Sequence, residues 1–260
     1  MDFYEIDQLK NELDKFRPLS PELMEAIDKK FKIEWTYNSN AIEGNTLTLQ
    51  ETSFFLQHGL TSKGKPLKDY LEVQNHAEAI DWLKEIIKDN RPITEGLIKE
   101  LHALLLRGID HIWVGPPENR VKKNITPGKY KTEPNHVVTL EGDIHYYCDP
   151  IRVPEEMERL VEMINKSDFH PVELSARAHY GLVAVHPFDD GNGRVARLLM
   201  NLILMKKGFL PVVIKNEKRE DYYTALMKAD KGDIEDFIRL VAQEEKISLQ
   251  TVIDVINHKK

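Results

Sequence analysis

Helix start and stop residues are the feature of this sequence that most constrains its fold. Apolar residues recur at helical spacing through most of the chain, and capping residues or glycines mark where the periodic runs begin and end. Ser20 before Pro21 predicts the start of a long helix that should end at Gly44, because proline suits the first helical position and glycine follows the last. The pattern predicts an all-α bundle.

The same reasoning places the remaining helices. The segment TLQE, from Thr48, is a capping box and predicts a short helix ending near Gly59. A periodic run over residues 68–89 predicts the next helix, and Thr94 caps another that should end near Gly108. Five further helix starts are expected, at Pro154, Pro171, Gly193, Lys218 and Asp233.

Residues 109–153 break this helical pattern with proline, glycine, asparagine and alternating residues. The segment HVVTLEGDIHYY predicts a short β-hairpin with its turn at residues 141–143. We find no other strand pattern, so the expected fold is a helical bundle with one small hairpin.

Charge and cysteine content limit the function. The chain has 36 Lys+Arg against 43 Asp+Glu, a net charge of -7, which argues against general binding to nucleic acid or anionic membranes. Its single cysteine, Cys148, excludes an internal disulfide and agrees with a reducing compartment. The first residues lack a signal-peptide pattern, and no apolar run reaches membrane-spanning length. We therefore expect a cytoplasmic protein that binds neither nucleic acid nor membrane.

Residues 170–208 carry the most informative pattern, a helix, a tight loop and a second helix. The first helix is apolar at core spacing and brings His186 to its C-terminal end. Gly191 and Gly193 flank Asn192 just before the second helix, so backbone N–H groups and the helix dipole converge on the loop. This arrangement predicts an anion-binding cradle.

Three charged residues complete a site for polyphosphate chemistry. Arg194 and Arg197 share one helix face and would grip phosphate oxygens. Asp190 is a hard oxygen ligand of the kind that holds Mg²⁺ beside phosphates. Taken singly, these residues suit an ordinary interhelical turn with a helix-end histidine and solvated arginines. Their combination within twelve residues favours phosphoryl chemistry.

The segment HPFDDGNGRVAR, His186 to Arg197, resembles the motif of the Fic family, HPFx[DE]GN[GK]R followed three residues later by Arg. The similarity extends over most of residues 31–243 to the catalytic core of the Fic AMP transferases of the animal endoplasmic reticulum. It implies the Fic fold and transfer of AMP from ATP to a hydroxyl of a target protein. Glycine at position 193, where family members resembling kinases have lysine, favours AMP transfer.

The resemblance assigns a role to each motif residue. His186 would be the general base, and Asp190 would bind Mg²⁺. Asn192, with the amides of Gly191 and Gly193, would cradle the transferred α-phosphate, whereas the outer phosphates would be held by Arg194 and Arg197.

Two segments outside the motif also acquire expected roles. The hairpin would be a flap that aligns a target segment by strand addition through Val137 and Val138, although an ordinary surface hairpin explains it too. Before the hairpin, the segment GKYKT has Lys131 where family members often have arginine, and the residues EPN lengthen it before His136.

Tyr222 and Tyr223 match an aromatic pair expected near the adenine. The alternative is an amphipathic helix with one tyrosine buried and the other exposed. Asp230 stands where the animal enzyme has an asparagine thought to approach the base.

The segment SNAIEG, Ser39 to Gly44, resembles the inhibitory motif [ST]xxxE[GN] of the family. A carboxylate in a final helical turn faces the negative end of the helix dipole, so Glu43 needs a compensating partner. The resemblance gives that partner as Arg197, with Ser39 holding the helix one turn earlier. Such a pair would occupy the guanidinium that should receive the γ-phosphate. The alternative is a solvated glutamate and a surface serine.

The predicted organisation is an N-terminal helical region with the inhibitory helix at residues 1–60, a Fic catalytic core at 61–243 and a helical tail at 244–260. Expected partners are ATP, Mg²⁺, a target protein, the chain itself as a modified substrate and a second copy in a homodimer. Alternative activities are removal of AMP and transfer of UMP or phosphocholine. The alternative outside enzymes is a nucleotide-binding regulatory module.

Overall fold

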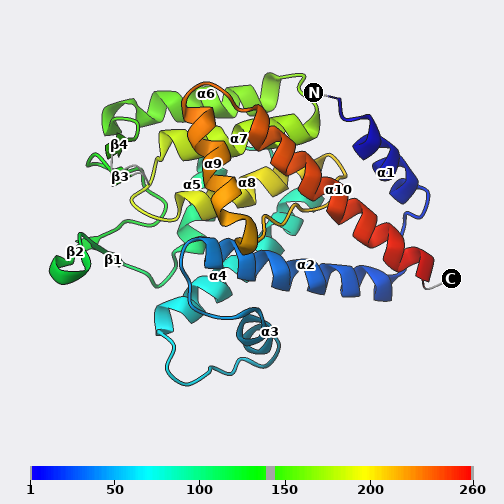
Figure 1. The fold of residues 1–260 in the computed structure, drawn as a ribbon, viewed down its shortest axis with the longest axis horizontal. Coiled ribbons are helices and arrows are strands. Elements are labelled where there is room, and N and C mark those ends of the chain that lie inside the picture. The colour runs from blue at the N-terminus through cyan, green and yellow to red at the C-terminus, as the bar shows by residue number, and fades with distance from the viewer. Residues whose placement is uncertain (1, 139–143, 259–260) are drawn as a thin grey trace.

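The computed structural model describes residues 2–138 and 144–258. Its helices are α1 (Tyr4–Asp14), α2 (Pro21–Ile42), α3 (Leu49–His58), α4 (Leu67–Lys88), α5 (Glu95–Leu105), α6 (Val153–Lys166), α7 (Pro171–Val185), α8 (Asn192–Lys206), α9 (Arg219–Asp230) and α10 (Glu235–His258). Two antiparallel strand pairs accompany them, β1 (His111–Val114) with β2 (Val121–Asn124) and β3 (His136–Val138) with β4 (Ile144–Tyr146). The predicted all-α fold is confirmed (Figure 1).

The predicted helix caps are present. The Ser20 side chain accepts a hydrogen bond from Leu23 N–H at the start of α2, and Thr94 caps α5. Thr48 and Glu51 form the complete capping box of α3, each side chain accepting a hydrogen bond from the other's backbone N–H. These bonds satisfy donors that the first helical turn leaves unpaired.

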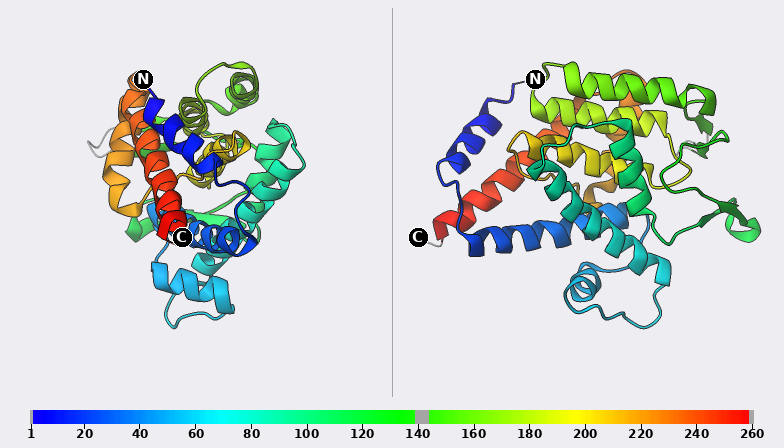
Figure 2. Two further views of the ribbon diagram at one scale, coloured as in Figure 1. Left: turned by 90° about the vertical axis from the view of Figure 1, so that its right-hand side faces the viewer. Right: turned by 180° about the vertical axis from the view of Figure 1, so that it is seen from behind.

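Helices α7 and α8 form the centre of the molecule. They pack against each other as a helical hairpin, and α2, α4, α5, α6, α9 and α10 lie around them (Figures 1 and 2). Nearly all of α8 is buried, including Arg194 and Arg197. A helix that is buried on all sides normally carries apolar residues, so two buried arginines require partners from neighbouring elements.

The expectation of a single strand pair is wrong, because β1 and β2 form a second hairpin. Trp113 lies opposite Lys122, and Val114 lies opposite Val121. The strands have only four residues each, and proline and glycine in the connection obscure the alternation. The predicted turn of the β3–β4 hairpin, at residues 141–143, lies outside the described residues.

The three-part organisation remains a prediction. The division expected at residue 243 falls inside α10, which packs against α1, α7 and α9. Among the described ranges, no helix is long and apolar enough to cross a membrane.

Candidate active site

His186 lies where α7 ends and the loop to α8 begins. It has a left-handed backbone conformation (φ 50°), which is uncommon outside glycine. Its Nδ1 lies 3.3 Å from the Val183 carbonyl, and because a carbonyl only accepts, Nδ1 carries the proton and Nε2 keeps its lone pair. Burial lowers the pKa of His186 to about 4, so the imidazole is neutral near pH 7. This histidine is suited to accept a proton.

The loop after His186 is fixed by its own side chains. The Asn192 amide accepts a hydrogen bond from Phe188 N–H (2.9 Å) and donates one to Phe188 O (2.8 Å). Phe188 is buried and stacks on His102 at 3.8 Å. His102 accepts a hydrogen bond from Gly128 N–H and donates one through Nε2 to Asp190 O at 3.0 Å. Asn192 therefore shapes the cradle through the loop backbone.

The predicted cradle lies at the N-terminus of α8. Gly191 has φ 75° and is the residue before the helix, so the chain turns sharply and presents the first N–H groups of α8. Asp190, with 28% of its side chain exposed, lies beside this turn, 3.4 Å from Arg194. The helix N-terminus, the carboxylate and the arginines therefore meet as the sequence predicts.

The two arginines are both almost fully buried, with 3% and 2% of their side chains exposed. Arg194 forms an ion pair with Glu72 of α4 at 2.9 Å. Its Nε is buried without a hydrogen-bond partner among the described residues. An unsatisfied buried donor is costly, so this guanidinium has capacity for a further anionic partner.

Arg197 uses its guanidinium donors within the chain. They bond to Ser39 Oγ (3.0 Å), Ser39 O (2.8 Å), Tyr222 OH (3.2 Å) and Glu43 Oε1 (2.7 Å). Burial alone would lower the pKa of Arg197, but the adjacent Glu43 carboxylate, together with Tyr222 and Tyr223, raises that pKa above its usual value. The ion pair and the Ser39 contact that the family resemblance implies are both present.

Glu43 also lies against the cradle. It caps the C-terminus of α2, and an ideal Cβ placed on Gly193 would stand 2.3 Å from its Oε1. Two heavy atoms without a bond cannot approach this closely. The Glu43 carboxylate therefore occupies space that any larger residue at position 193 would fill.

The two tyrosines of α9 have different surroundings. Tyr222 is buried, and its hydroxyl accepts a hydrogen bond from Arg197 and lies 3.1 Å from Nε2 of His179. Tyr223 is partly buried, with the Arg219 guanidinium 4.9 Å from its ring centroid. Asp230 accepts a hydrogen bond from the Tyr180 hydroxyl at 3.2 Å. Tyr222 thus supports an arginine of the motif, and the adenine role of both tyrosines remains a prediction.

The predicted flap lies next to the catalytic loop. Val137, 45% exposed, pairs with His145 in the hairpin, and Val138 pairs with Ile144. Beyond β4, the Tyr147 ring stacks on His186 at 3.8 Å. The exposed Val137 side chain leaves the β3 strand accessible to a peptide, whereas Tyr147 covers one face of the imidazole.

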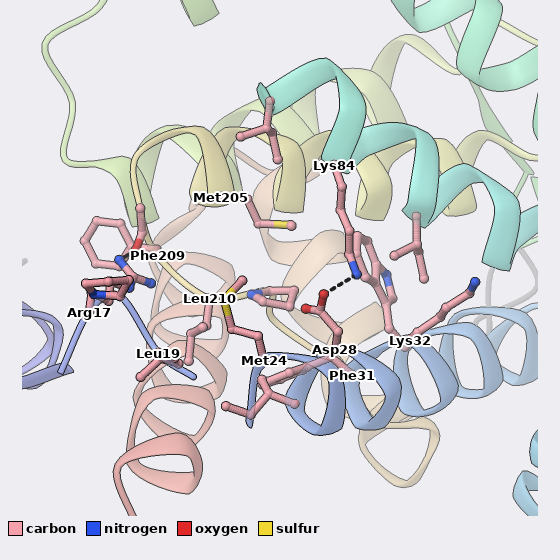
Figure 3. Close-up of a pocket in the computed structure, with 17 residues that line it drawn as sticks. Arg17, Leu19, Met24, Asp28, Phe31, Lys32, Lys84, Met205, Phe209 and Leu210 are labelled. Carbon is pink, nitrogen blue, oxygen red and sulfur yellow. Dashed lines mark hydrogen bonds and ion pairs between the residues drawn. The ribbon is translucent and has the colours of Figure 1, made fainter. Parts of the chain in front are cut away.

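A separate cavity of about 770 Å³ lies between the first half of α2, α4 and the segment after α8 (Figure 3). Phe31 of α2 and Leu210 line it, and the Asp28–Lys84 ion pair (2.8 Å) joins α2 to α4 there. None of the predicted site residues lines this cavity. This cavity is therefore separate from the candidate active site at the N-terminus of α8.

Comparison with known proteins identifies the family. The model of the Fic/DOC family matches residues 92–204, a range that includes His186 and Arg197. The structure of a Fic domain containing signaling protein from Bacteroides thetaiotaomicron superposes with a TM-score of 0.87 at 35% identity, covering 96% of this chain and 95% of that chain. The chain belongs to the Fic family. A fragment of Fic-1 from C. elegans has a TM-score of 0.81 at 30% identity, covering 99% of this chain and 72% of that fragment.

Curated Fic relatives are longer than this chain. The protein adenylyltransferase Fic of Nematostella vectensis is 35% identical over 246 residues, covering 92% of this chain and 52% of the relative. The protein adenylyltransferase fic-1 of Caenorhabditis elegans is 34% identical over 224 residues, covering 84% and 41%. This chain therefore spans about half the length of the curated relatives it matches, or less.

Several residues that contact the motif in this Fic site were not apparent from the sequence alone. Glu72, His102 and Tyr147 each contact a motif residue from another part of the chain. Glu72 and His102 lie inside regular helices, where an isolated polar residue has no distinctive spacing. Their contacts become apparent only when α4 and α5 pack beside α8.

Proposed function

We propose that this chain is a protein adenylyltransferase that transfers AMP from ATP to a hydroxyl of a target protein, and that Glu43 restrains the reaction. The observation that carries the proposal is the Glu43–Arg197 ion pair of 2.7 Å beside the N-terminus of α8. Arg197 lies one helical turn after Gly193 of the motif. The names of the curated relatives, protein adenylyltransferases, support the reaction class.

The transfer step follows from the positions of the side chains. His186 Nε2 accepts the proton of the attacking hydroxyl, whose oxygen forms a bond to the α-phosphorus of ATP. The bond from that phosphorus to the oxygen bridging the β-phosphate breaks, and pyrophosphate leaves with the electron pair. The N-terminal amides of α8 stabilise the negative charge on the α-phosphate. Arg194, with its unpartnered Nε, binds the outer phosphates.

Asp190 would hold Mg²⁺. Its carboxylate is partly exposed beside the cradle, and no group of three or more His, Cys, Asp or Glu residues in the described chain forms a dedicated metal cage. One carboxylate fits Mg²⁺, which usually retains waters and takes phosphate oxygens as further ligands. When bound, the ion would neutralise charge on the phosphates.

The restraint arises because two anions compete for one buried guanidinium. While Glu43 bonds to Arg197, the γ-phosphate cannot pair with that arginine and is repelled by the carboxylate. ATP is then held out of line for attack on its α-phosphorus. Removing the carboxylate should free Arg197 for the nucleotide.

The test compares wild type with Glu43→Gly after incubation with ATP and Mg²⁺, using intact-mass analysis to detect AMP on the chain itself and on added proteins. We expect more AMP transfer by the variant. His186→Ala in the same background is the control. It should bind ATP yet lose about a hundredfold or more of the transfer rate, because only proton transfer is removed. A folded Glu43→Gly protein with no gain would contradict the restraint.

The position of Glu43 against Gly193 favours a second candidate activity, the removal of AMP from modified protein. A carboxylate beside the cradle can orient water toward the α-phosphorus, and His186 would return a proton to the target oxygen. AMP-labelled protein made by Glu43→Gly would be purified and mixed with wild type or with the variant. Release by wild type alone supports this activity, and release by neither protein excludes it.

A further inference from the structure

Lys131 is a buried ammonium group that forms no salt bridge with any described residue. Its side chain donates hydrogen bonds to Asn135 Oδ1 (2.6 Å) and to Val185 O (3.4 Å), and the residue is 3% exposed. Burial lowers the pKa of Lys131 to about 8. Because a buried charge without a carboxylate partner is costly, the chain retains this lysine against an energetic penalty.

The partners of Lys131 lie on both sides of His186. Val185 precedes the histidine, and the Lys131 backbone N–H donates to Pro187 O at 2.8 Å immediately after it. Asn135 extends the contact by donating to Phe188 O at 3.2 Å. Lys131 and Asn135 thus bind three carbonyls that flank the imidazole, and we call this pair the clamp.

The clamp also connects the loop to the stacked tyrosine. Tyr147 N–H donates to Asn135 O at 3.3 Å, while its ring lies over His186. Asn135 belongs to the EPN residues that lengthen this segment, and Lys131 stands where family members often have arginine. The two departures noted in the sequence therefore contact each other and the catalytic loop.

We propose that Lys131 is a positioning residue for His186. Together with Asn135 it holds the histidine in place, and its ammonium charge disfavours an imidazolium cation at His186. This inference rests on the proposed base role of His186. The charge supplies electrostatic repulsion toward an imidazolium, and the hydrogen bonds fix the loop that carries the ring. Lys131 is too deeply buried to bind the target.

The other groups facing His186 set the sign of the effect. Burial is the largest influence and lowers the pKa of His186, and Lys131 lowers it further. Glu43 from α2 and Asp190 from the loop raise that pKa. Tyr147 faces the ring as a neutral phenol, since burial raises its own pKa to about 12. Removing the lysine charge should therefore raise the pKa of His186.

The experiment uses Lys131→Met, Lys131→Arg and Asn135→Ala in the Glu43→Gly background, with transfer rates measured from neutral to acidic pH. We expect Lys131→Met to lower kcat by about tenfold or more, to leave KM for ATP nearly unchanged and to shift the acidic limb to higher pH. Lys131→Arg should restore both kcat and the limb. Asn135→Ala should lower kcat without moving the limb, because no charge is lost. Lys129→Met, at an exposed neighbouring lysine, is the matched control.

The outcomes separate this inference from the proposed function. Unchanged kcat and pH limb in Lys131→Met, or a loss that Lys131→Arg does not rescue, would overturn the positioning role. NMR titration of His186 gives a second readout that needs no turnover, and an unshifted titration in Lys131→Met also overturns it. If Lys131→Met fails to fold, Asn135→Ala still tests the clamp, and an unchanged kcat in that variant would overturn the positioning role. If the Glu43→Gly parent itself transfers no AMP, the proposed function fails while the titration still tests the clamp.

Discussion

Arg197 is the residue on which the proposed restraint depends, because its buried charge needs an anionic partner. The guanidinium is almost fully enclosed, so without an anion at its outer edge it would be a buried charge lacking compensation. Glu43 supplies that anion in the structure, and a phosphate of ATP would supply it in the active form. The two anions compete for the same position beside the Arg197 guanidinium. Glu43 can occupy that position only because Gly193 leaves space for its carboxylate.

We predict that Gly193→Ala releases Glu43 from Arg197. The new methyl group would lie 2.3 Å from Glu43 Oε1, so the carboxylate must move away. Position 193 has no positive φ and lies in the first turn of α8, where alanine favours the helix. AMP transfer by the folded variant should rise above wild type, as measured by intact mass.

The double variant Gly193→Ala with Glu43→Gly is the control for this prediction. If the methyl group acts only on Glu43, the double variant should match Glu43→Gly alone. A lower rate would show that the methyl group also obstructs the nucleotide. If Gly193→Ala transfers AMP only at the wild-type rate while Glu43→Gly transfers it faster, Glu43 tolerates the methyl group without leaving Arg197.

The sequence predicts the site only where chemistry is contiguous or carried by a family motif. His186 to Arg197 are neighbours in the chain, and the partner of Arg197 followed from the resemblance of SNAIEG to the inhibitory motif. Lys131 and Asn135 were visible only as departures from the family pattern. Their bonds to the loop depend on how the segment before β3 packs against the end of α7, which local sequence patterns do not encode.

At the scale of elements, the proposed restraint depends on where α2 ends. Arg219 of α9 donates through Nε to Ile42 O at 2.8 Å, satisfying one of the carbonyls that the last turn leaves unpaired. The Asn38 side chain accepts a hydrogen bond from Asn216 N–H at 2.8 Å. These contacts hold the C-terminal half of α2 against the start of α9 and the residues just before it, and with it the carboxylate of Glu43.

Arg219→Ala should therefore weaken the restraint without abolishing it. Losing a hydrogen bond worth about 1 kcal/mol changes an equilibrium by about fivefold, so transfer should rise severalfold but remain below that of Glu43→Gly. The measurement is the initial rate of AMP incorporation. Arg239→Ala, which removes a 65% exposed arginine of α10, is the control and should leave the rate unchanged. Equal rates for both variants would show that α2 is held by other contacts.

The strands show why short elements escape prediction. The β1–β2 hairpin has four-residue strands, one of which reads VKKN, and its exposed Val114 and Val121 leave no strict alternation. Helices of ten or more residues repeat their pattern several times and carry caps such as Ser20 and Thr48. Repetition and capping made the helical bundle predictable, and both are absent from the hairpin.

At the scale of the whole molecule, buried histidines make stability depend on pH. Burial lowers the pKa of His102 and of His186 to about 4, and it lowers the pKa values of His76 and His179 well below 6.5. The unfolded chain protonates these groups near 6.5, so it binds more protons than the folded chain between that pH and about 4. As the pH is lowered through this window, the free energy of unfolding should decrease, by at most about 1.4 kcal/mol per pH unit for each histidine. Denaturant unfolding near neutral pH and at about pH 5 measures the decrease.

Glu245 opposes this trend and provides the control. Burial raises the pKa of this carboxyl group well above 4.5, so the folded chain retains a proton that the unfolded chain releases. Glu245 therefore makes the folded protein more stable relative to the unfolded chain as the pH falls. Glu245→Gln mimics the protonated form at every pH, and the loss of stability on acidification should be steeper in this variant. A flat profile in both proteins would show that the histidines accept protons without unfolding.

The requirement for glycine at position 193 also has a genetic consequence. Every glycine codon becomes an alanine codon, and every glutamate codon becomes a glycine codon, through one change at the second base. If Glu43 restrains transfer as proposed, an unrestrained enzyme is a single nucleotide away at position 193 and again at position 43. Loss of regulation is then a frequent event in any large population, so the restraint persists only where selection steadily removes cells that modify their proteins without control.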